Sequence, residues 1–254
     1  EKYIIYDKNN IGKGYDSYNN NLLFECEYLK GKRNGIGKEY NIKGDIIFEG
    51  EYKNGKRNGK GKEFNEEGVI IYEGEYLDGK RNGKGKEYNE HGNLIFDGEY
   101  KNGEKRKGIL RKYDSNYDYI VLEVNYQYGQ KNGKVRKFYP GGRLEFEGKY
   151  INGKRIGRGI EYSYNGNIIF DGEYLNDHRK RGKEYINGKL IYEGEYLFDK
   201  FWTGKFYDDR GNILYEGKRI FSTAEKGTTI SCIKGTIDAD GKIEGKYLLY
   251  NTWS

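Results

Sequence analysis

The residues best suited to acid, base or metal chemistry are few in this chain. It contains two histidines, His91 and His178, and two cysteines, Cys26 and Cys232, and neither histidine lies near a cysteine in the sequence. A zinc site needs His and Cys ligands at short, regular spacings, and a serine or cysteine nucleophile needs a histidine base beside it. Because the sequence offers neither pattern, we predict no metal site, no cofactor and no nucleophilic catalysis.

Glycine-rich and acidic segments also give no catalytic signature. Gly59-Lys60-Gly61-Lys62 is superficially like a phosphate loop, but such a loop joins a strand to a helix whose N–H groups converge on the phosphate, and no helical pattern follows. The carboxylates recur in identical contexts, whereas acid–base catalysis needs two carboxylates in different environments. We therefore predict that the protein is not an enzyme. The two cysteines are expected to lie farther apart than the ~7 Å between Cα atoms that a disulfide allows.

Positive charge is concentrated in one central segment. Residues 101–160 hold fifteen Lys or Arg and six Asp or Glu, a net charge of +9, whereas the whole chain carries +6. Such a zone can meet an acidic protein surface or anionic lipid headgroups, or it can simply be solvated. Nucleic acid is disfavoured, because the tyrosines recur even where the charge is neutral and so add no specificity. A second basic turn lies at 178–181, and the cations that we single out for partner binding are Lys105, Arg106, Lys107, Arg111 and Lys112.

A repeat of about 24 residues must position these side chains. The segment Phe48-Glu49-Gly50-Glu51-Tyr52 has five close copies and four weaker ones, at spacings of 22 to 28 residues. Each unit divides into an apolar strand, a turn such as Asn54-Gly55, and a return strand of the pattern Gly-Lys-Gly-Lys-Glu. Asn-Gly is the pair that most easily takes positive φ in a two-residue hairpin. Because glycine is too frequent for a helix, we predict about ten consecutive antiparallel β-hairpins.

Strand alternation assigns the side chains of a unit to two faces. It places Phe48, Gly50 and Tyr52 on one face and the glutamates between them on the other. The rings are expected to cover the bare backbone of return-strand glycines, and Glu and Lys to pair across strands on the opposite face, at about 0.2–1 kcal/mol per pair. We expect most of the tyrosine area to pack within the array. The tyrosines whose ring edges are candidates for partner contact are Tyr52, Tyr76, Tyr100, Tyr150, Tyr174 and Tyr196.

The unit resembles the MORN repeat. The shared pattern is Tyr/Phe-x-Gly-x-Tyr-x-Asn/Asp-Gly-Lys-x-x-Gly-x-Gly, present at residues 48–61, 72–85 and 146–159. The form found here is nearest to the MORN variant of bacteria and some protists. The resemblance implies an elongated hairpin array with an aromatic-lined groove. It also implies a scaffold or recognition role in protein assembly or membrane-associated complexes, and related bacterial arrays are often described as antitoxin-like.

These observations predict an all-β fold. We expect an elongated, right-handed twisted, single-layer array of consecutive antiparallel hairpins over residues 1–218, and a divergent capping hairpin over 219–254, where the Asn-Gly-Lys-Arg signature is lost. Glu1 to Tyr3 resemble the end of the repeated strand, so we expect further repeats upstream in the intact protein.

The predicted function is a non-catalytic scaffold or recognition module that binds another protein. The alternatives are a peripheral binder of anionic membrane lipids and an antitoxin-like or immunity protein. A homodimer through one end of the array is a further possible association. No segment reaches the ~20 apolar residues that span a bilayer, so a cytoplasmic or membrane-peripheral location is favoured.

Overall fold

The computed structural model describes residues 2–6, 10–116, 118–218, 229–234 and 246–251. All regular structure in these residues is β-strand, and none of them forms a helix. It follows that no described helix is long and apolar enough to cross a membrane. Packing divides the chain into two compact units, residues 1–132 and 133–254.

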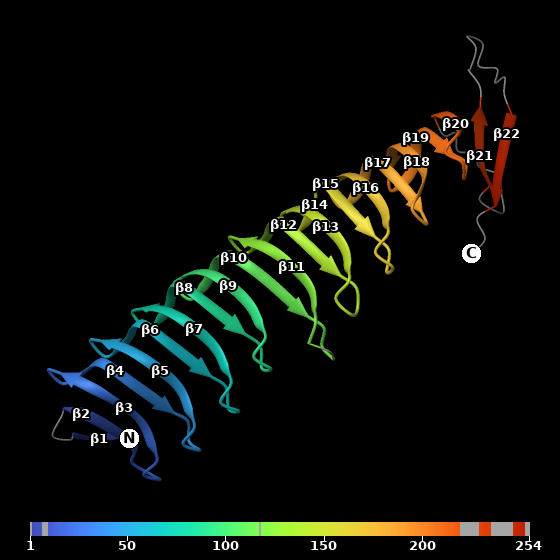
Figure 1. Ribbon diagram of the computed structural model, residues 1–254. Coiled ribbons are helices and arrows are strands. Elements are labelled where there is room, and N and C mark those ends of the chain that lie inside the picture. The colour runs from blue at the N-terminus through green and yellow to red at the C-terminus, as the bar shows by residue number, and fades with distance from the viewer. Residues whose placement is uncertain (1, 7–9, 117, 219–228, 235–245, 252–254) are drawn as a thin grey trace. The chain divides into compact units, whose positions relative to one another are not determined.

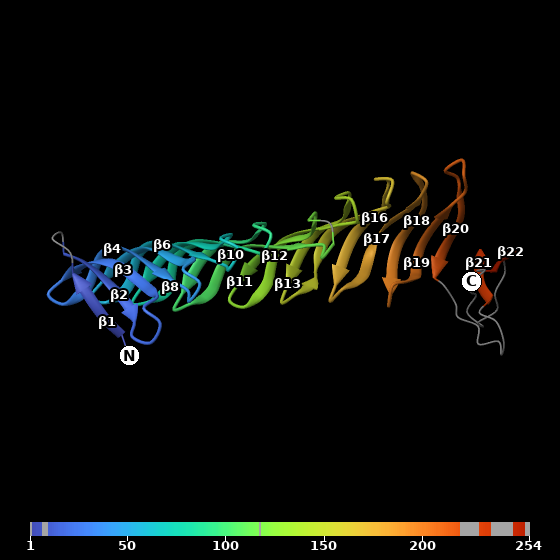
Figure 2. The ribbon, with the colours of Figure 1, turned by 90° about the horizontal axis from the view of Figure 1, so that it is seen from below.

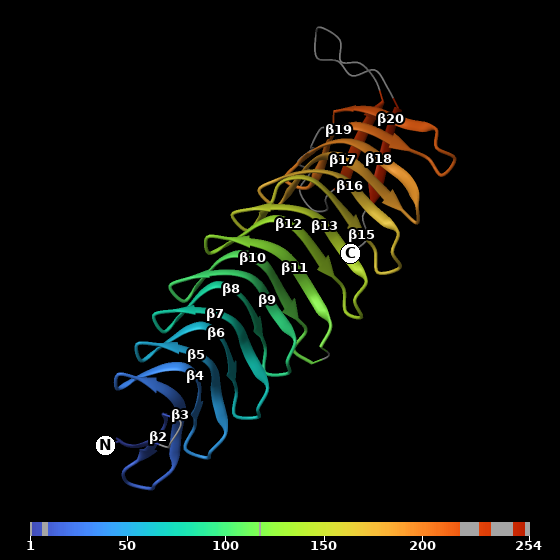
Figure 3. The ribbon, with the colours of Figure 1, turned by 60° about the vertical axis from the view of Figure 1, so that its left-hand side comes forward.

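In residues 1–132 consecutive strands from β1 to β11 pair antiparallel, so the hairpins follow one another in chain order as a single layer (Figure 1). Figure 3 shows that these strands are curved. The strands are β1 (Lys2–Tyr6), β2 (Ile11–Asp16), β3 (Leu22–Leu29), β4 (Lys32–Tyr40), β5 (Ile46–Lys53), β6 (Lys56–Phe64), β7 (Ile70–Leu77), β8 (Lys80–Tyr88), β9 (Leu94–Lys101), β10 (Glu104–Tyr113) and β11 (Ile120–Gln127).

The second unit continues the same pattern, again as one layer of sequential strands (Figure 2). A separate two-stranded sheet holds β21 and β22, within the segment that we predicted as a cap. The strands are β12 (Gln130–Phe138), which begins in the first unit, β13 (Leu144–Ile151), β14 (Lys154–Arg155), β15 (Gly157–Tyr162), β16 (Ile168–Leu175), β17 (His178–Ile186), β18 (Lys189–Leu197), β19 (Lys200–Tyr207), β20 (Ile213–Lys218), β21 (Thr229–Lys234) and β22 (Lys246–Asn251).

The hairpin turns have the geometry that the Asn-Gly pairs predict. Asn54 and Gly55 take φ values of 52° and 86°, so both central residues are left-handed, as a type I′ turn requires. Two turns place an aromatic residue in that conformation, namely Tyr128 (φ 48°) and Phe198 (φ 50°). A bulky residue with positive φ is a genuine outlier, and both side chains are largely exposed.

The core of each unit is a row of rings over paired glycines. Gly50 pairs with Gly61, and a Cβ placed on Gly61 would lie 2.6 Å from Cζ of Phe48, so only bare backbone fits beneath the ring. Phe48 is fully buried, and the rings of Tyr52 and Tyr76 meet it edge-on at centroid distances of 5.7 and 5.3 Å. The predicted cover of glycine by rings is confirmed. We call the face that carries these rings the inner face.

The predicted Glu/Lys ladder occupies the opposite, outer face. Lys62 stands opposite Glu49 on one side and Glu73 on the other, and its Nζ lies 3.8 Å from the Glu49 carboxylate. Both side chains are at least one-third exposed, so each such pair contributes little to stability.

Candidate functional site

A row of alternating arginines and glutamates runs over the rings on the inner face. The Arg57 guanidinium lies 3.9 Å above the Phe48 ring centroid, hydrogen-bonds Glu39, and lies 3.6 Å from Glu63. In each repeat the cation lies nine positions after the first aromatic residue, and the glutamate lies fifteen positions after that aromatic residue, or fourteen in the case of Glu184. We call this row the charged spine. Its members within residues 1–132 are Arg33, Glu39, Arg57, Glu63, Arg81, Glu87 and Lys105, and its members within residues 133–254 are Arg155, Glu161, Arg179 and Glu184.

Each spine glutamate also accepts a hydrogen bond from a core tyrosine. Glu63 accepts from the Tyr76 hydroxyl at 2.6 Å and from Arg81. Burial alone raises the pKa of Glu63, but the hydrogen bonds from Arg81 and Tyr76 and the charges of Arg81 and Arg57 outweigh burial and hold the pKa below its usual value. Burial is the largest cause that raises the pKa of Tyr76, and the hydrogen bond to Glu63 and the charge of Glu63 raise it further, against the smaller opposing effect of the charges of Arg81 and Arg57. The carboxylate is therefore ionised and the phenol neutral at physiological pH.

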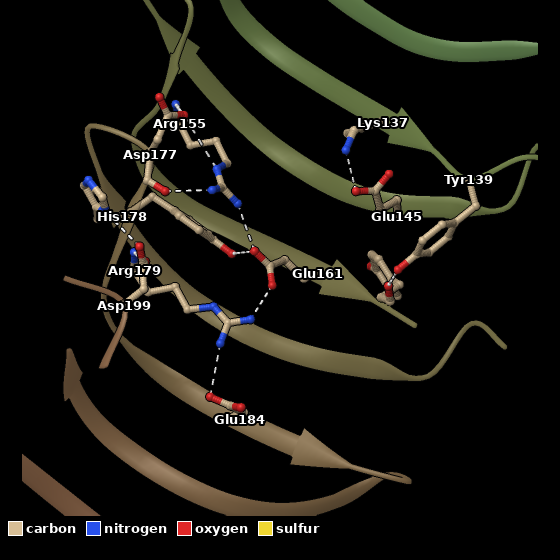
Figure 4. Close-up of polar contacts among 12 residues, drawn as sticks. Lys137, Tyr139, Glu145, Arg155, Glu161, Asp177, His178, Arg179, Glu184 and Asp199 are labelled. Atoms are coloured by element: carbon tan, nitrogen blue, oxygen red, sulfur yellow. Dashed lines mark hydrogen bonds and ion pairs between the residues drawn. The ribbon is translucent and has the colours of Figure 1, made fainter. Parts of the chain in front are cut away.

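The second unit repeats this arrangement. Figure 4 shows Arg155 and Arg179 converging on Glu161, with Arg179 reaching onward to Glu184 at 3.1 Å. The Tyr174 hydroxyl donates to Glu161 at 2.7 Å. Burial is again offset by hydrogen bonds from Arg179 and Tyr174, so the pKa of Glu161 is lowered.

The spine accounts for most of the tyrosines that we predicted as candidate contacts. Tyr150 is half-buried and has no spine glutamate beside it, because Lys137 stands opposite Phe146, where a regular unit has Glu. The other five candidates are buried, and their hydroxyls donate to spine glutamates: Tyr52, Tyr76, Tyr100, Tyr174 and Tyr196. Their accessible surface is small, as the packing interpretation predicts.

The five predicted cations of the central zone lie in different surroundings. Lys105 takes the place of the spine arginine, with its Nζ 3.0 Å from Glu87 and 5.3 Å from the Phe96 ring centroid. Arg111 points to the outer face and pairs with Glu123 at 3.0 Å. Arg106 lies over the Tyr128 ring at 5.4 Å, and Lys107 and Lys112 are exposed. The structure thus divides these cations between the two faces.

The basic turn at 178–181 is largely paired within the unit. Arg179 belongs to the spine, and His178 Nδ1 lies 2.6 Å from Asp199 (Figure 4). The Arg181 guanidinium lies 2.5 Å from Glu173. Burial raises the pKa of Asp199, but the hydrogen bonds from His178 and the Arg179 backbone outweigh it and lower the pKa. This turn therefore offers few free charges.

The charged spine stops where the repeat slips. In a regular unit a single glutamate, Glu63, stands opposite both Phe48 and Tyr72. Strand β10 is longer, and it places Leu110 opposite Phe96 and Lys112 opposite Leu122, so no carboxylate occupies the position. We call residues 96–131 the slipped unit. A hollow of about 1080 Å³ lies beside it, lined in part by Lys101, Lys105, Arg106, Tyr126 and Tyr128.

The isolated candidates for chemistry remain isolated. In the described part of the chain no group of three or more His, Cys, Asp or Glu side chains is placed to hold a metal ion. Cys26 is a buried free thiol on the inner face, and burial raises its pKa to about 11. The side chain of Cys232 lies outside the described residues.

Sequence reasoning missed the spine itself. It assigned the basic residues of the turns and return strands to a solvated ladder, whereas Arg57, Arg81 and Arg179 cover the rings and are only about one-fifth to one-quarter exposed. Glu63 could have been found from the sequence, because it lies two residues beyond Gly61 and so shares its face. The face of Arg57 could not be found in this way. Arg57 pairs with Tyr52 and Gly61 pairs with Gly50, but three residues lie between Arg57 and Gly61 whereas one residue lies between Tyr52 and Gly50, so alternation along the return strand is interrupted.

The comparisons with known proteins agree with this architecture. The family model described as MORN repeat matches residues 26–46, 48–65, 72–90 and 146–168. No curated protein matches the chain. The matched segments include the spine residues from Arg33 to Glu87 and those at Arg155 and Glu161, whereas the unmatched residues include the slipped unit and the hairpins that carry Arg179 and Glu184. The chain is a MORN repeat protein.

Proposed function

We propose that this protein is a non-catalytic recognition module that binds another protein through the slipped unit of the array. MORN repeats are in general interaction modules for proteins or membranes. The observation that carries the proposal is the hollow beside β10, where cationic and aromatic side chains meet at one surface. Elsewhere in the spine the arginine and tyrosine side chains interact with glutamates of the same chain.

Tyr128 is the strongest single pointer to a partner. It occupies a left-handed turn position that Asn or Asp fills in regular units, and its side chain is 66 % exposed. The Arg106 guanidinium lies over its ring, 5.4 Å from the centroid, and the interaction with Arg106 lowers the pKa of Tyr128. Backbone strain at an exposed aromatic residue does not stabilise the fold, and the side chain of Tyr128, unlike that of Phe198, lines the hollow beside β10. Aromatic and arginine side chains are also enriched at binding hot spots.

The experiment uses a substitution that should raise the stability of the protein and that removes the aromatic ring proposed to contact the partner. Tyr128→Asn restores an Asn-Gly turn, so it should raise the midpoint of unfolding, and it should also weaken capture of the partner from the source cells. Phe198→Asn makes the matched change at the other strained turn, in the second unit, and should leave capture unchanged. The captured protein is identified and rebound in purified form. Unchanged binding by Tyr128→Asn would show that the slipped unit is not the contact.

The same samples separate the other functions. Binding to vesicles of anionic lipid that Tyr128→Asn abolishes, without any purified protein partner, would replace the proposal with a lipid-binding role. Rescue of cells from a toxin, with the toxin as the captured protein, would identify the module as antitoxin-like and would name the partner.

A further inference from the structure

In the regular units a spine carboxylate is surrounded by a fixed set of donors. Glu63 is held by the Tyr76 hydroxyl and the Arg81 guanidinium, and Glu39 by Tyr52 and Arg57 in the same way. The tyrosine is the fifth residue of the following unit and the cation its tenth. Every such site therefore combines one neutral O–H donor with one or two cations around a single carboxylate.

The slipped unit keeps the donors and lacks the acid. Tyr126 is the fifth residue of the unit that begins at Leu122, and Lys131 is its tenth. The residue opposite Leu122, where Glu63 stands opposite Tyr72, is Lys112. Among the described residues of the first unit, Lys112 and Lys131 form no ion pair and Tyr126 has no carboxylate partner. The site therefore keeps the tyrosine (Tyr126) and the cation (Lys131), and a second cation (Lys112) stands where the regular repeats have the carboxylate.

The two lysines are electrostatically unsatisfied. Lys131 is half-buried, whereas Lys112 is exposed. Lys112 stands opposite Leu122, where a regular repeat has the spine glutamate. In agreement with that placement, burial lowers the pKa of Lys131 and the charge of Lys112 lowers it further. A half-buried ammonium beside a like charge destabilises the free protein, and an anion that binds between the two groups would remove that cost.

We infer that Lys112 and Lys131, with the Tyr126 hydroxyl, form a receptor for a carboxylate of an acidic segment in the partner protein, which takes the place of the glutamate that the spine lacks at this unit. The inference rests on the proposed function and specifies the chemistry of the partner. The model for the bound state lies in the same chain, in the Tyr76–Glu63–Arg81 arrangement.

The surroundings favour an acidic protein segment over other anions. In the regular repeats this position is occupied by a single carboxylate that accepts a hydrogen bond from a phenol. It is not built like a phosphate site, in which backbone N–H groups converge on the anion. The adjacent hollow is lined by five cations, Lys101 and Arg106 among them, and by two glutamates, so it extends the positive surface beyond the position of one carboxylate. Tyrosine and arginine provide the aromatic and cationic contacts that protein interfaces use.

The test supplies the missing acid from within the chain. The double variant Lys112→Glu/Lys131→Arg rebuilds the pattern of Glu63 and Arg81, so the site is occupied by its own carboxylate. Binding of a fluorescent oligoglutamate peptide is followed by anisotropy at low and at raised salt. Wild-type protein should bind, and the repaired variant should lose about tenfold in affinity or more, because a hydrogen bond to a charged group contributes about 1.5–3 kcal/mol.

Two control variants keep the test specific. Lys107→Glu/Lys60→Arg makes the same changes in residue type and net charge on the outer face, and it should retain peptide binding within about twofold. Lys112→Arg/Lys131→Arg keeps both charges and should also retain binding. The repaired variant should unfold at a higher urea concentration than wild type, which excludes unfolding as the reason for its loss of binding.

The remaining outcomes decide against the inference or against the proposed function on which it rests. Equal losses in the repaired and outer-face variants would mean that only overall charge matters. Binding of short polyphosphate or of anionic vesicles without binding of oligoglutamate would assign the two lysines to phosphate. A protein partner that the repaired variant captures as well as wild type does would overturn the inference and leave the proposed function standing. Peptide binding with no protein partner in the source cells would leave the carboxylate site and remove the proposed function.

Discussion

Replacement of Glu63 by glutamine tests whether the charged spine stabilises the array. Glu63→Gln preserves the size of the side chain and one oxygen acceptor, but it removes the charge that faces Arg57 and Arg81. The glutamate side chain is only 18 % exposed, so the two guanidinium groups would be left without their shared counter-ion in a partly desolvated place. We expect a loss of stability that is much larger than the loss for an exposed pair.

The magnitude follows from the geometry. At 3.6 Å and an effective dielectric constant of about 20, one ion contact is worth roughly 4–5 kcal/mol before desolvation is subtracted. Breaking a buried pair by removing one partner typically costs about 3–5 kcal/mol, and partial exposure reduces that figure. We therefore expect a cost of about 2–3 kcal/mol. The matched control is Glu49→Gln on the outer face, where the pair with Lys62 is exposed and the expected cost is about 0–1 kcal/mol.

The assay combines urea unfolding with amide hydrogen exchange, because stacked repeats can open locally before they unfold globally. Protection in β6 and β7 should fall in Glu63→Gln and should persist in Glu49→Gln. The pH dependence adds a second criterion. The folded-state pKa of Glu63 is lowered, so its contribution is present above the unfolded pKa of ~4.3 and is lost as pH falls through the folded value.

The stability difference between wild type and Glu63→Gln should accordingly shrink as the solution is acidified below about pH 4. Equal costs for the two glutamine variants at neutral pH, or a gap that does not shrink in acid, would refute the assignment of stability to the spine.

Two further substitutions test the core and its tyrosine hydrogen bond. Gly61→Ala should destabilise by about 1–3 kcal/mol, because the new Cβ would lie 2.6 Å from the Phe48 ring; in a double-mutant cycle measured by urea unfolding, Phe48→Leu should recover part of that loss, and strict additivity would contradict the ring-over-glycine packing. Tyr76→Phe removes the hydroxyl that donates to Glu63 and should cost about 1.5–3 kcal/mol in the same assay, whereas a neutral result would mean that Arg81 alone satisfies the carboxylate.

The sequence was sufficient to predict the hairpins and the two faces of each strand. The Asn54-Gly55 turn and the alternation of Phe48 with Gly50 follow from backbone rules that hold residue by residue. The spine depends instead on register. Tyr52 pairs with Arg57 and Gly50 pairs with Gly61, so the pairing register of the two strands shifts at a β-bulge between these pairs. Alternation cannot fix the face of a residue across such a bulge.

The slipped unit escaped prediction for the same reason. Counted along the sequence, Arg111 occupies the position of Glu63, and this count places a cation from the basic zone over the rings. The two additional residues that β10 contributes to pairing put Arg111 on the outer face, opposite Glu123, and give the inner positions to Leu110 and Lys112. A list of basic residues therefore could not separate the cations that are paired from those that are available. Lys131, which lies outside that list, holds the same tenth position of its repeat as Arg81, but it becomes a candidate only once the structure places Lys112, and no carboxylate, opposite Leu122.

The slipped unit differs from a regular repeat both in its core residues and in its charged residues, and only the core substitutions compensate each other. In the core, Leu122 replaces the first ring and Val124 replaces the glycine beneath it, and both side chains are buried. A smaller apolar side chain and a larger neighbour preserve the packed volume, so the change is compensated inside the protein. The charges are not compensated, because Lys112 replaces the acid while Lys131 keeps a cation in the position of Arg81. If drift alone had altered this unit, the half-buried charge would be expected to disappear as readily as the ring did, since it destabilises the free chain. An uncompensated ammonium beside a fully compensated core is the arrangement expected where the missing carboxylate comes from another molecule.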